Sequence, residues 1–316
     1  MTTLTEYYAN EGINISTLKA MRRSPLHYLE ALANSRIATR PMNVGTATHV
    51  LTFEPERFDD AIAVWRGDTR PYVVWDGGDR RGKEWAAFKA AHPDELILKP
   101  AEVADHLAGI SKCARQGEAW KAFESANSQR IILTEKELIP ARAMARAVRE
   151  HPASKALLRD GRAELPMFWT DPVTGLDCKG RVDWTNEREH IIVDLKTARD
   201  VSPRVFSRQA ERLGYALQAA FYADGYAQLH DGIEPAVYVV SVESVRPHDV
   251  IVYEVESDTL DIGRTAYLAL LQRVRECVLA DEWPGQAPNV VPFELPPWAL
   301  TEEEEGIDLS GVEAAQ

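Results

Sequence analysis

The chain has 316 residues, 45% of them hydrophobic, and 49 acidic against 36 basic side chains give it a formal net charge of −13. This length suits one large domain or two small ones, with enough apolar residues for a substantial core. No stretch approaches the ~20 apolar residues of a membrane span, and the polar start MTTLTEYYANEG does not resemble a signal peptide. Three scattered cysteines exclude a disulfide framework or a paired cysteine metal motif, and we expect a reduced, cytoplasmic setting.

The acidic balance at first argues against a nucleic-acid partner, because phosphate binding favours a basic surface. Part of the charge, however, lies in the last sixteen residues, where we expect a solvated tail carrying Glu302, Glu303, Glu304, Glu305, Asp308 and Glu313. A nuclease also gathers carboxylates around its metal, and bound cations reverse the local sign. The net charge therefore neither supports nor excludes a nucleic-acid partner.

Residues 1–160 are predicted to be mainly helical. Ser16 is a candidate N-cap for the first helix, and Ser24 followed by Pro25 is typical of the start of a second. Residues 66–82, rich in Gly, Asp and Arg, predict an exposed loop. The other helices predicted in this section cover residues 45–53, 84–92, 100–125 and 135–160.

The pattern changes at Glu164, where short alternating segments separated by turns predict strands. Three consecutive strands are expected at residues 165–171, 178–185 and 190–197. A helix over 214–230, strands at 235–243 and 249–255, and a long helix over 257–281 follow. We predict one domain over 1–300, with a helical section (1–160), a catalytic core (161–285) and a Pro-rich segment (286–300), before an acidic tail at 301–316.

The second and third of these strands carry the residues that suggest chemistry. Side chains alternate along a strand, so Asp194 and Lys196 should share one face while Leu195 points into the core. The same alternation places Val182 and Trp184 on the face opposite Asp183. A hairpin can then bring Asp183 beside Asp194, with Lys196 one step further on.

Two carboxylates this close repel each other unless a cation lies between them. Oxygen ligands with open water positions suit Mg²⁺, with Mn²⁺ as a substitute. Such an ion polarises a phosphoryl oxygen and lowers the pKa of bound water, while a lysine offsets developing negative charge, which is the chemistry of phosphodiester hydrolysis. A D-x-K tripeptide by itself is more often a solvated surface pair.

Four other residues support the hydrolytic interpretation only as part of a set. Glu164 opens the preceding strand and can supply another carboxylate, although such a residue is commonly just a charge at a strand edge. Gln218 and Tyr222 lie four residues apart on the next helix and face the same way. His49 is a candidate imidazole ligand, although a lone histidine is usually structural.

The order and separation of these motifs resemble the nuclease domain of the phage and prophage exonuclease VIII (RecE) type, in the RecB-like branch of the PD-(D/E)XK nucleases. The resemblance runs through ISTLKAMRRSPLHYLEAL, VGTATHVLTFEPERF, ELPMFW, LDCKGRVDW, IIVDLKTARD, GYALQAAFYADGY and the closing WPG and LPPWA. It therefore spans nearly the whole chain. The implied fold is α/β: a restriction-endonuclease-like core with a mixed central sheet flanked by helices, and an N-terminal helical section.

The resemblance also implies roles. Asp183 and Asp194 match metal-binding carboxylates, the main-chain carbonyl of Leu195 a further ligand, and Lys196 the catalytic lysine. His49 matches an extra metal-ligand histidine, and Glu164 matches an upstream acidic residue. Gln218 and Tyr222 match the QxxxY helix.

The implied activity is Mg²⁺-dependent, 5′ to 3′ degradation of linear double-stranded DNA from its ends. The 3′ single strands left behind would pass to a single-strand annealing protein of the RecT type, in the cytoplasm of a bacterial host. Relatives form rings, so a homo-oligomer is expected.

Arginines are candidate phosphate contacts, because guanidinium pairs well with phosphate oxygens. They are Arg22, Arg23, Arg181, Arg142, Arg146 and Arg149.

Three alternatives stay open: a related endonuclease or single-strand nuclease, an inactive nuclease fold kept for DNA binding, and an acidic Ca²⁺-binding or interaction protein. The intact Asp183, Asp194 and Lys196 disfavour the second, and the absence of EF-hand spacing disfavours the third.

Overall fold

The computed structural model describes residues 10–34 and 38–295. The acidic tail at 301–316 and the start of the chain therefore lie outside the described residues, as does the end of the Pro-rich segment. Within the described ranges, no helix has both the length and the apolar character needed to span a membrane.

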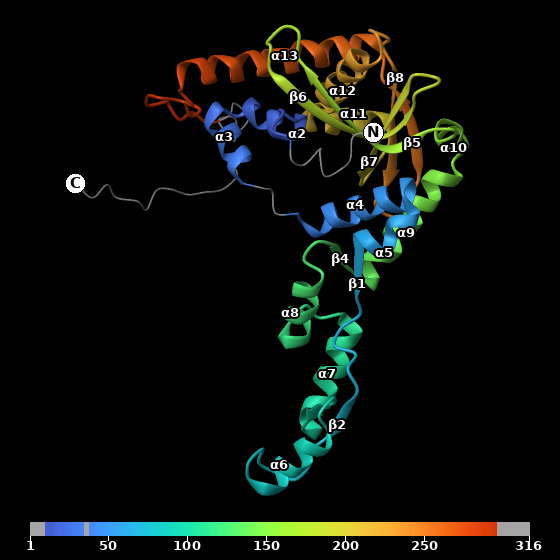
Figure 1. The fold of residues 1–316 in the computed structure, drawn as a ribbon, viewed down its shortest axis with the longest axis vertical. Helices are drawn as coiled ribbons and strands as arrows, with labels where there is room; N and C mark the ends of the chain where they lie inside the picture. The colour runs from blue at the N-terminus through green and yellow to red at the C-terminus, as the bar shows by residue number, and fades with distance from the viewer. Residues whose placement is uncertain (1–9, 35–37, 296–316) are drawn as a thin grey trace, which may run out of the picture.

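A five-stranded mixed sheet forms the centre of the molecule (Figure 1). Its strands are β5 (Arg162–Thr170), β6 (Asp177–Asn186), β7 (Ile191–Ala198), β8 (Ala236–Glu243) and β9 (Val250–Glu254). They lie in chain order, and every neighbouring pair is antiparallel except β7 and β8. That parallel pair needs a crossover connection, which α11 (Pro203–Leu213) and α12 (Tyr215–Leu229) supply. The predicted core strands and the mixed sheet are confirmed.

One face of the sheet is covered by helices from both ends of the chain. They are α12, α13 (Ser257–Ala280), α2 (Ile15–Leu18), the 3-10 helix η1 (Lys19–Arg22) and α3 (Pro25–Ala33). Fully buried side chains from α2, α12 and α13, including Leu18, Phe221 and Leu271, pack with Val182 and Ile192 of the sheet. The N-terminal helices are thereby fixed against the central sheet.

The opposite face is covered by α4 (Arg40–Phe53) and α9 (Glu135–Glu150). Met144 and Val148 of α9 pack against Val193 and Leu195 of β7, and all four are at most 1% exposed. The short helices η2 (Pro55–Arg57), α5 (Phe58–Ala61) and α10 (Pro152–Leu157) flank this layer.

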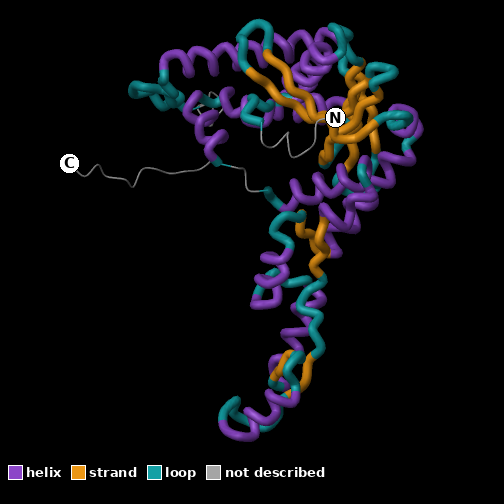
Figure 2. Tube along the Cα trace, in the orientation of Figure 1, coloured by secondary structure: helices purple, strands orange, loops and turns teal. Residues whose placement is uncertain are grey.

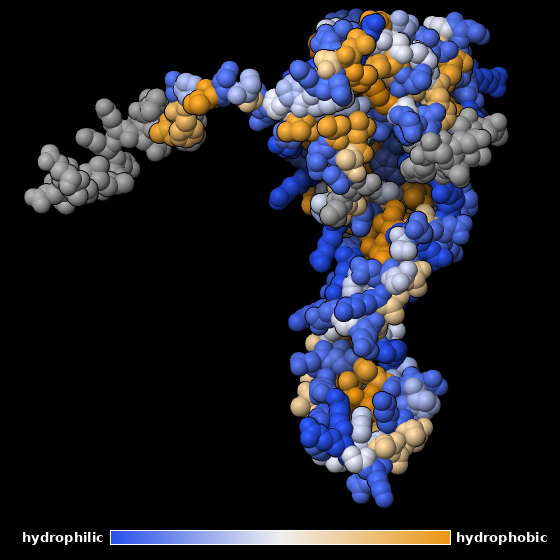
Figure 3. All heavy atoms as spheres, turned by 60° about the vertical axis from the view of Figure 1, so that its left-hand side comes forward, coloured by the Kyte–Doolittle hydropathy of each residue, from blue (hydrophilic) through white to orange (hydrophobic). Residues whose placement is uncertain are grey.

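An arm built from residues 62–134 extends away from the sheet (Figures 1 and 2). Its helices are α6 (Gly82–Ala91), α7 (Pro100–Lys112) and α8 (Gly117–Ala126). Two parallel strand pairs run through it: β1 (Ile62–Trp65) with β4 (Ile131–Thr134), and β2 (Tyr72–Val74) with β3 (Leu96–Leu98). The arm is largely hydrophilic outside, with apolar side chains gathered in its lower part (Figure 3). Trp65 and Trp75 are 5% and 8% exposed, so they pack internally.

The N-terminal elements differ from the prediction in several respects. Asn14, not Ser16, caps the first helix, because its side-chain oxygen accepts a hydrogen bond from Thr17 N at 3.0 Å. Ser24 caps α3 as predicted. The expected loop over 66–82 was wrong in part, since it contains β2 and the start of α6.

Helix lengths also differ. The helix around His49 begins at Arg40 rather than residue 45, and α11 was not predicted. The predicted helices over 100–125 and 135–160 are each two helices. The second divides at His151, because Pro152 cannot continue the backbone hydrogen bonding of α9.

Candidate active site

The candidate site lies where the β5–β6 ladder is interrupted. Ala163 pairs with Trp184 and Leu165 with Val182, which places Glu164 opposite Asp183 at the interruption. Glu164 has φ +54°, in the left-handed region that non-glycine residues seldom adopt. Such strain costs on the order of 1 kcal/mol or more and persists where the surrounding structure enforces it.

The interruption changes which face the strand residues occupy. Val182 belongs to the core under α12, whereas Trp184 belongs to the core under α9. The prediction that these two share one face was therefore wrong, because strict alternation fails at the ladder interruption, where Glu164 opposite Asp183 has left-handed backbone. In contrast, Leu195 is 1% exposed and points into the core as predicted, so only its main chain can contribute to the site.

Asp183 contacts both β7 and α4. Its Oδ2 accepts a hydrogen bond from Leu195 N at 2.7 Å and lies 3.3 Å from His49 Nδ1. Burial acts to raise the pKa of Asp183, but the imidazole, the Lys196 ammonium and the Leu195 amide together outweigh it and hold this pKa below its usual range. Burial likewise acts to lower the pKa of His49, and Asp183 raises it above its usual value.

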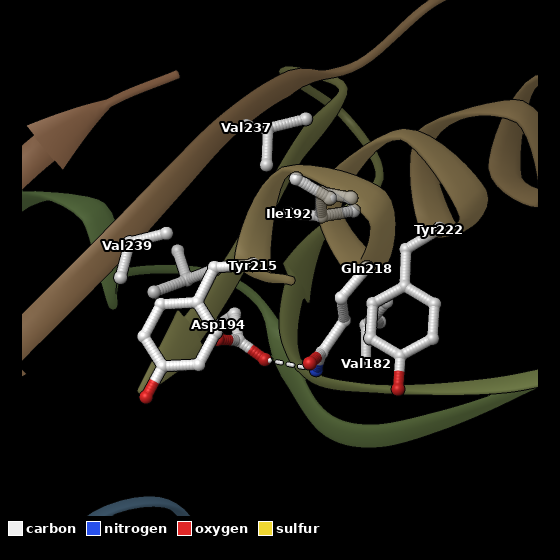
Figure 4. A pocket seen from close by; sticks show the side chains of 10 residues that line it. Val182, Ile192, Asp194, Tyr215, Gln218, Tyr222, Val237 and Val239 are labelled. Carbon is white, nitrogen blue, oxygen red and sulfur yellow. Dashed lines mark hydrogen bonds between the residues drawn. The ribbon is translucent and has the colours of Figure 1, made fainter. Parts of the chain in front are cut away.

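Asp194 is held by two side chains. Its Oδ2 lies 2.6 Å from Lys196 Nζ, and its Oδ1 accepts a hydrogen bond from Gln218 Nε2 at 2.8 Å. Figure 4 shows this amide approaching the carboxylate, with the rings of Tyr215 and Tyr222 nearby. Lys196 Nζ is also 3.4 Å from Gln218 Oε1 and 4.9 Å from the ring centre of Tyr215.

The electrostatics of this cluster follow from burial and pairing. Burial raises the pKa of Asp194, as does the neighbouring charge of Asp183, although the Lys196 ammonium opposes both. Burial alone would lower the pKa of Lys196, but the two carboxylates raise it, so the lysine remains an ammonium. The site thus places the Lys196 ammonium beside two carboxylates whose pKa values are shifted in opposite directions.

Glu164 and Arg181 form a second pair at the edge of the site. Arg181 Nε lies 2.7 Å from Glu164 Oε2. Burial raises the pKa of Glu164, and the guanidinium opposes this shift. Arg181, a predicted DNA contact, is therefore engaged with a carboxylate of the site.

The ring of Tyr222 packs on the β6 backbone at Gly180. A Cβ added at Gly180 would lie 3.1 Å from this ring. A side chain at position 180 would push this ring, so glycine permits the close approach of α12 to β6. The structure thus brings Tyr222 and Gln218 onto the side of α12 that faces the sheet.

The remaining predicted contacts lie outside this cluster. Arg22 and Arg23 are exposed, and Arg22 lies 3.6 Å from Glu211 at the end of α11. Two residues near Gln218 were not predicted, Tyr215 and Lys19. Tyr215 could have been found from its position one turn before the QxxxY motif, whereas nothing in the local sequence marks Lys19.

The donor set suits a divalent cation by type, since it combines two carboxylates with an imidazole. His49, Asp183 and Asp194 would hold the ion, with the Leu195 carbonyl as a further donor. As arranged in the described part of the chain, no three His, Cys, Asp or Glu side chains converge as a complete metal centre. Asp194 is instead oriented toward Lys196 and Gln218.

A mixed sheet that presents Asp183, Asp194 and Lys196 from adjacent strands, with helices on both faces, defines a protein of the PD-(D/E)XK fold class. A comparison with protein families agrees. Residues 14–291 match the family described as "PDDEXK-like domain of unknown function (DUF3799)". The chain belongs to this family.

A solved structure supports the fold. A protein from Eubacterium rectale, described as a "putative exonuclease", is 14% identical, with a TM-score of 0.55 over 97% of this chain and 99% of that one. A "phage related exonuclease" from Haemophilus somnus is 13% identical over 58% of this chain and 91% of that one; its TM-score of 0.30 is too low to bear on the fold. No curated protein matches the sequence.

Proposed function

We propose that the protein is a Mg²⁺-dependent exodeoxyribonuclease that degrades linear double-stranded DNA. The observation that carries this proposal is the grouping of Asp183, Asp194, Lys196 and Gln218 at the strand interruption. Family membership and the exonuclease description of the Eubacterium rectale protein support the same class of reaction. The RecE-type resemblance in the sequence adds the 5′ to 3′ polarity and the 3′ single-stranded product.

The chain's own residues supply three functions at a scissile phosphate. Lys196, held by Asp194 at 2.6 Å, places a positive charge where negative charge develops on the phosphate. Asp183 and Asp194 concentrate negative charge that a divalent ion would neutralise, and when bound that ion polarises a phosphoryl oxygen and lowers the pKa of a water. Gln218 and the main-chain amide of Leu195 fix the orientation of the two carboxylates.

A basic groove on α9 offers a path for the DNA backbone despite the acidic total charge. The groove is lined by three arginines of α9 (Arg142, Arg146 and Arg149), by Lys155 of the adjoining α10, and by the acidic Glu150. All four cations are exposed, and α9 packs on α4, the helix that carries His49. Exposed guanidinium groups in a groove can contact several phosphates of one strand.

The further parts of the proposal come from the resemblance. The product strand would pass to a RecT-like single-strand annealing protein. The enzyme would act as a homo-oligomer of the ring-forming type in the cytoplasm of a bacterial host. An inactive DNA-binding fold is the second candidate, but it would have no need for the intact group of Asp183, Asp194 and Lys196.

The decisive experiment compares linear duplexes labelled at either the 5′ or the 3′ end with a closed circular duplex, with and without Mg²⁺. We expect metal-dependent loss of one end label and no cutting of the circle. Asp194→Asn is the matched variant, since it keeps the shape of the side chain and removes its charge. Cutting of the circle would make the protein an endonuclease, and equal digestion by the variant would refute the assigned site.

A further inference from the structure

Lys19 lies beside the catalytic cluster although it comes from the N-terminal helices, 199 residues before Gln218. Its Nζ donates a hydrogen bond to Gln218 Oε1 at 3.1 Å. The same ammonium lies 5.8 Å from the ring centre of Tyr215, the ring that also contacts Lys196 at 4.9 Å. Two lysines therefore approach one amide oxygen.

The contacts of Gln218 determine which way its amide points. The oxygen and nitrogen ends of an amide are nearly alike in shape, so hydrogen-bond partners decide the orientation. Because Lys19 and Lys196 both present donors to Oε1, the Nε2 end is directed at Asp194, where it donates at 2.8 Å. The Lys19 contact is the shorter of the two, at 3.1 Å against 3.4 Å.

The position of Lys19 is fixed from the N-terminal side. Ile13 bridges to Cys178 of β6, with Ile13 N donating to Asp177 O at 2.8 Å and its carbonyl accepting from Lys179 N at 2.8 Å. This edge of β6 is accessible because β6 pairs with β7 only over 184–186. The segment leading into α2 is thus anchored on the strand that carries Asp183.

The neighbouring residues fix Lys19 from the other directions. Leu18 and Met21 on either side of it are 0% exposed in the core. Gly214, between α11 and α12, has φ +65°, and a Cβ there would lie 3.4 Å from Lys19 Cε. Lys19 therefore passes closely over the start of α12 before it reaches Gln218.

We propose that Lys19 is a positioning residue that acts through Gln218 to orient the carboxylate of Asp194. The inference rests on the proposed function and deepens it, since it adds the N-terminal helices to the machinery that aims a metal-binding carboxylate. Outer-shell partners of this kind typically change metal affinity or activity by about 10–100-fold.

The test measures Mn²⁺ affinity by titration calorimetry on the full chain, independently of DNA degradation. Lys19→Met keeps the apolar stem, Lys19→Arg keeps a charged donor, and Lys83→Met removes an exposed lysine of the arm as a control. We expect Mn²⁺ affinity to fall about tenfold in Lys19→Met, and Lys19→Arg and Lys83→Met to stay within about threefold of the parent. Equal affinity in Lys19→Met and the parent would overturn the role.

A double-mutant cycle in the nuclease assay separates positioning from simple structural support. If Lys19 acts through Gln218, adding Lys19→Met to Gln218→Met lowers kcat by less than about threefold beyond Gln218→Met alone. If the double variant instead lowers kcat by the product of the factors measured for the two single variants, the inference is overturned. A parent protein that binds Mn²⁺ but leaves DNA intact refutes the proposed function alone; one that does neither refutes both.

Discussion

Gly263 lies at the point where α13 crosses α12, and its replacement by alanine tests the packing that supports the site. An added Cβ would lie 2.2 Å from the carbonyl oxygen of Ala216 and 2.6 Å from its carbonyl carbon. Ordinary contact begins near 3.4 Å, so the helices would have to separate by about 1.2 Å. The obstacle is backbone, and no side-chain rotation can relieve it.

The expected cost follows from this geometry. Overpacking costs about 1–3 kcal/mol, and a rigid backbone obstacle favours the upper end, while the better helix propensity of alanine returns about 1 kcal/mol. We expect Gly263→Ala to destabilise the protein by about 2 kcal/mol. Ala216 lies two residues before Gln218, so the shift also reaches the site, where a displacement of about 1 Å can lower the rate by about 100-fold.

The assay is denaturant unfolding together with the rate of duplex degradation. Gly109→Ala is the matched control, because Gly109 lies within α7 and an added Cβ there meets nothing within 4 Å. This control should leave stability unchanged or raise it by up to about 1 kcal/mol, with full activity. A Gly263→Ala protein as stable and active as Gly109→Ala would refute the reasoning.

Three further outcomes are expected. A chelator should abolish degradation and added Mg²⁺ should restore it; activity that survives chelation would contradict a metal-dependent mechanism. Reversing charge in the α9 groove, with Arg146→Glu and Arg149→Glu together, should raise KM and reduce the salt slope of DNA binding by about 2, and an unchanged slope would exclude the groove as a backbone contact. Burial raises the pKa of Cys178 to about 12. In the native protein, mass spectrometry should therefore find Cys178 unlabelled by a maleimide and the half-buried Cys113 labelled. Equal labelling of the two thiols would contradict this expectation.

The parts of the site that the sequence predicted are those set by short-range regularity. Asp194, Leu195 and Lys196 alternate along one regular strand, so their faces follow from the pleat. Gln218 and Tyr222 share a helix face through their spacing of four. Each of these arrangements depends on backbone geometry that neighbouring residues determine.

The parts that could not be predicted depend on distant contacts. The left-handed backbone of Glu164 departs from strand geometry, and no glycine or asparagine marks it. Lys19 reaches Gln218 only through the folding of the N-terminal helices onto the core. The arm strands β2 and β3 have three residues each, which is too few for an alternating apolar and polar pattern to be recognised in the sequence. In contrast, the missed helix α11 follows Ser202 and Pro203 and is polar with its apolar residues on one face, so it could have been predicted from the sequence.

The change of face along β6 also explains why an imidazole lies in the site. Trp184, turned toward the α4 side, stacks on Phe53 with ring centres 6.1 Å apart. His49 lies four residues before Phe53, on the same face of α4, with its ring centre 6.0 Å from that of Phe53. Phe53 packs on Trp184, and His49, one turn earlier on α4, lies beside Asp183, the residue that precedes Trp184. The left-handed backbone of Glu164, opposite Asp183, thus lies where Trp184 turns toward α4, the helix that places His49 3.3 Å from Asp183.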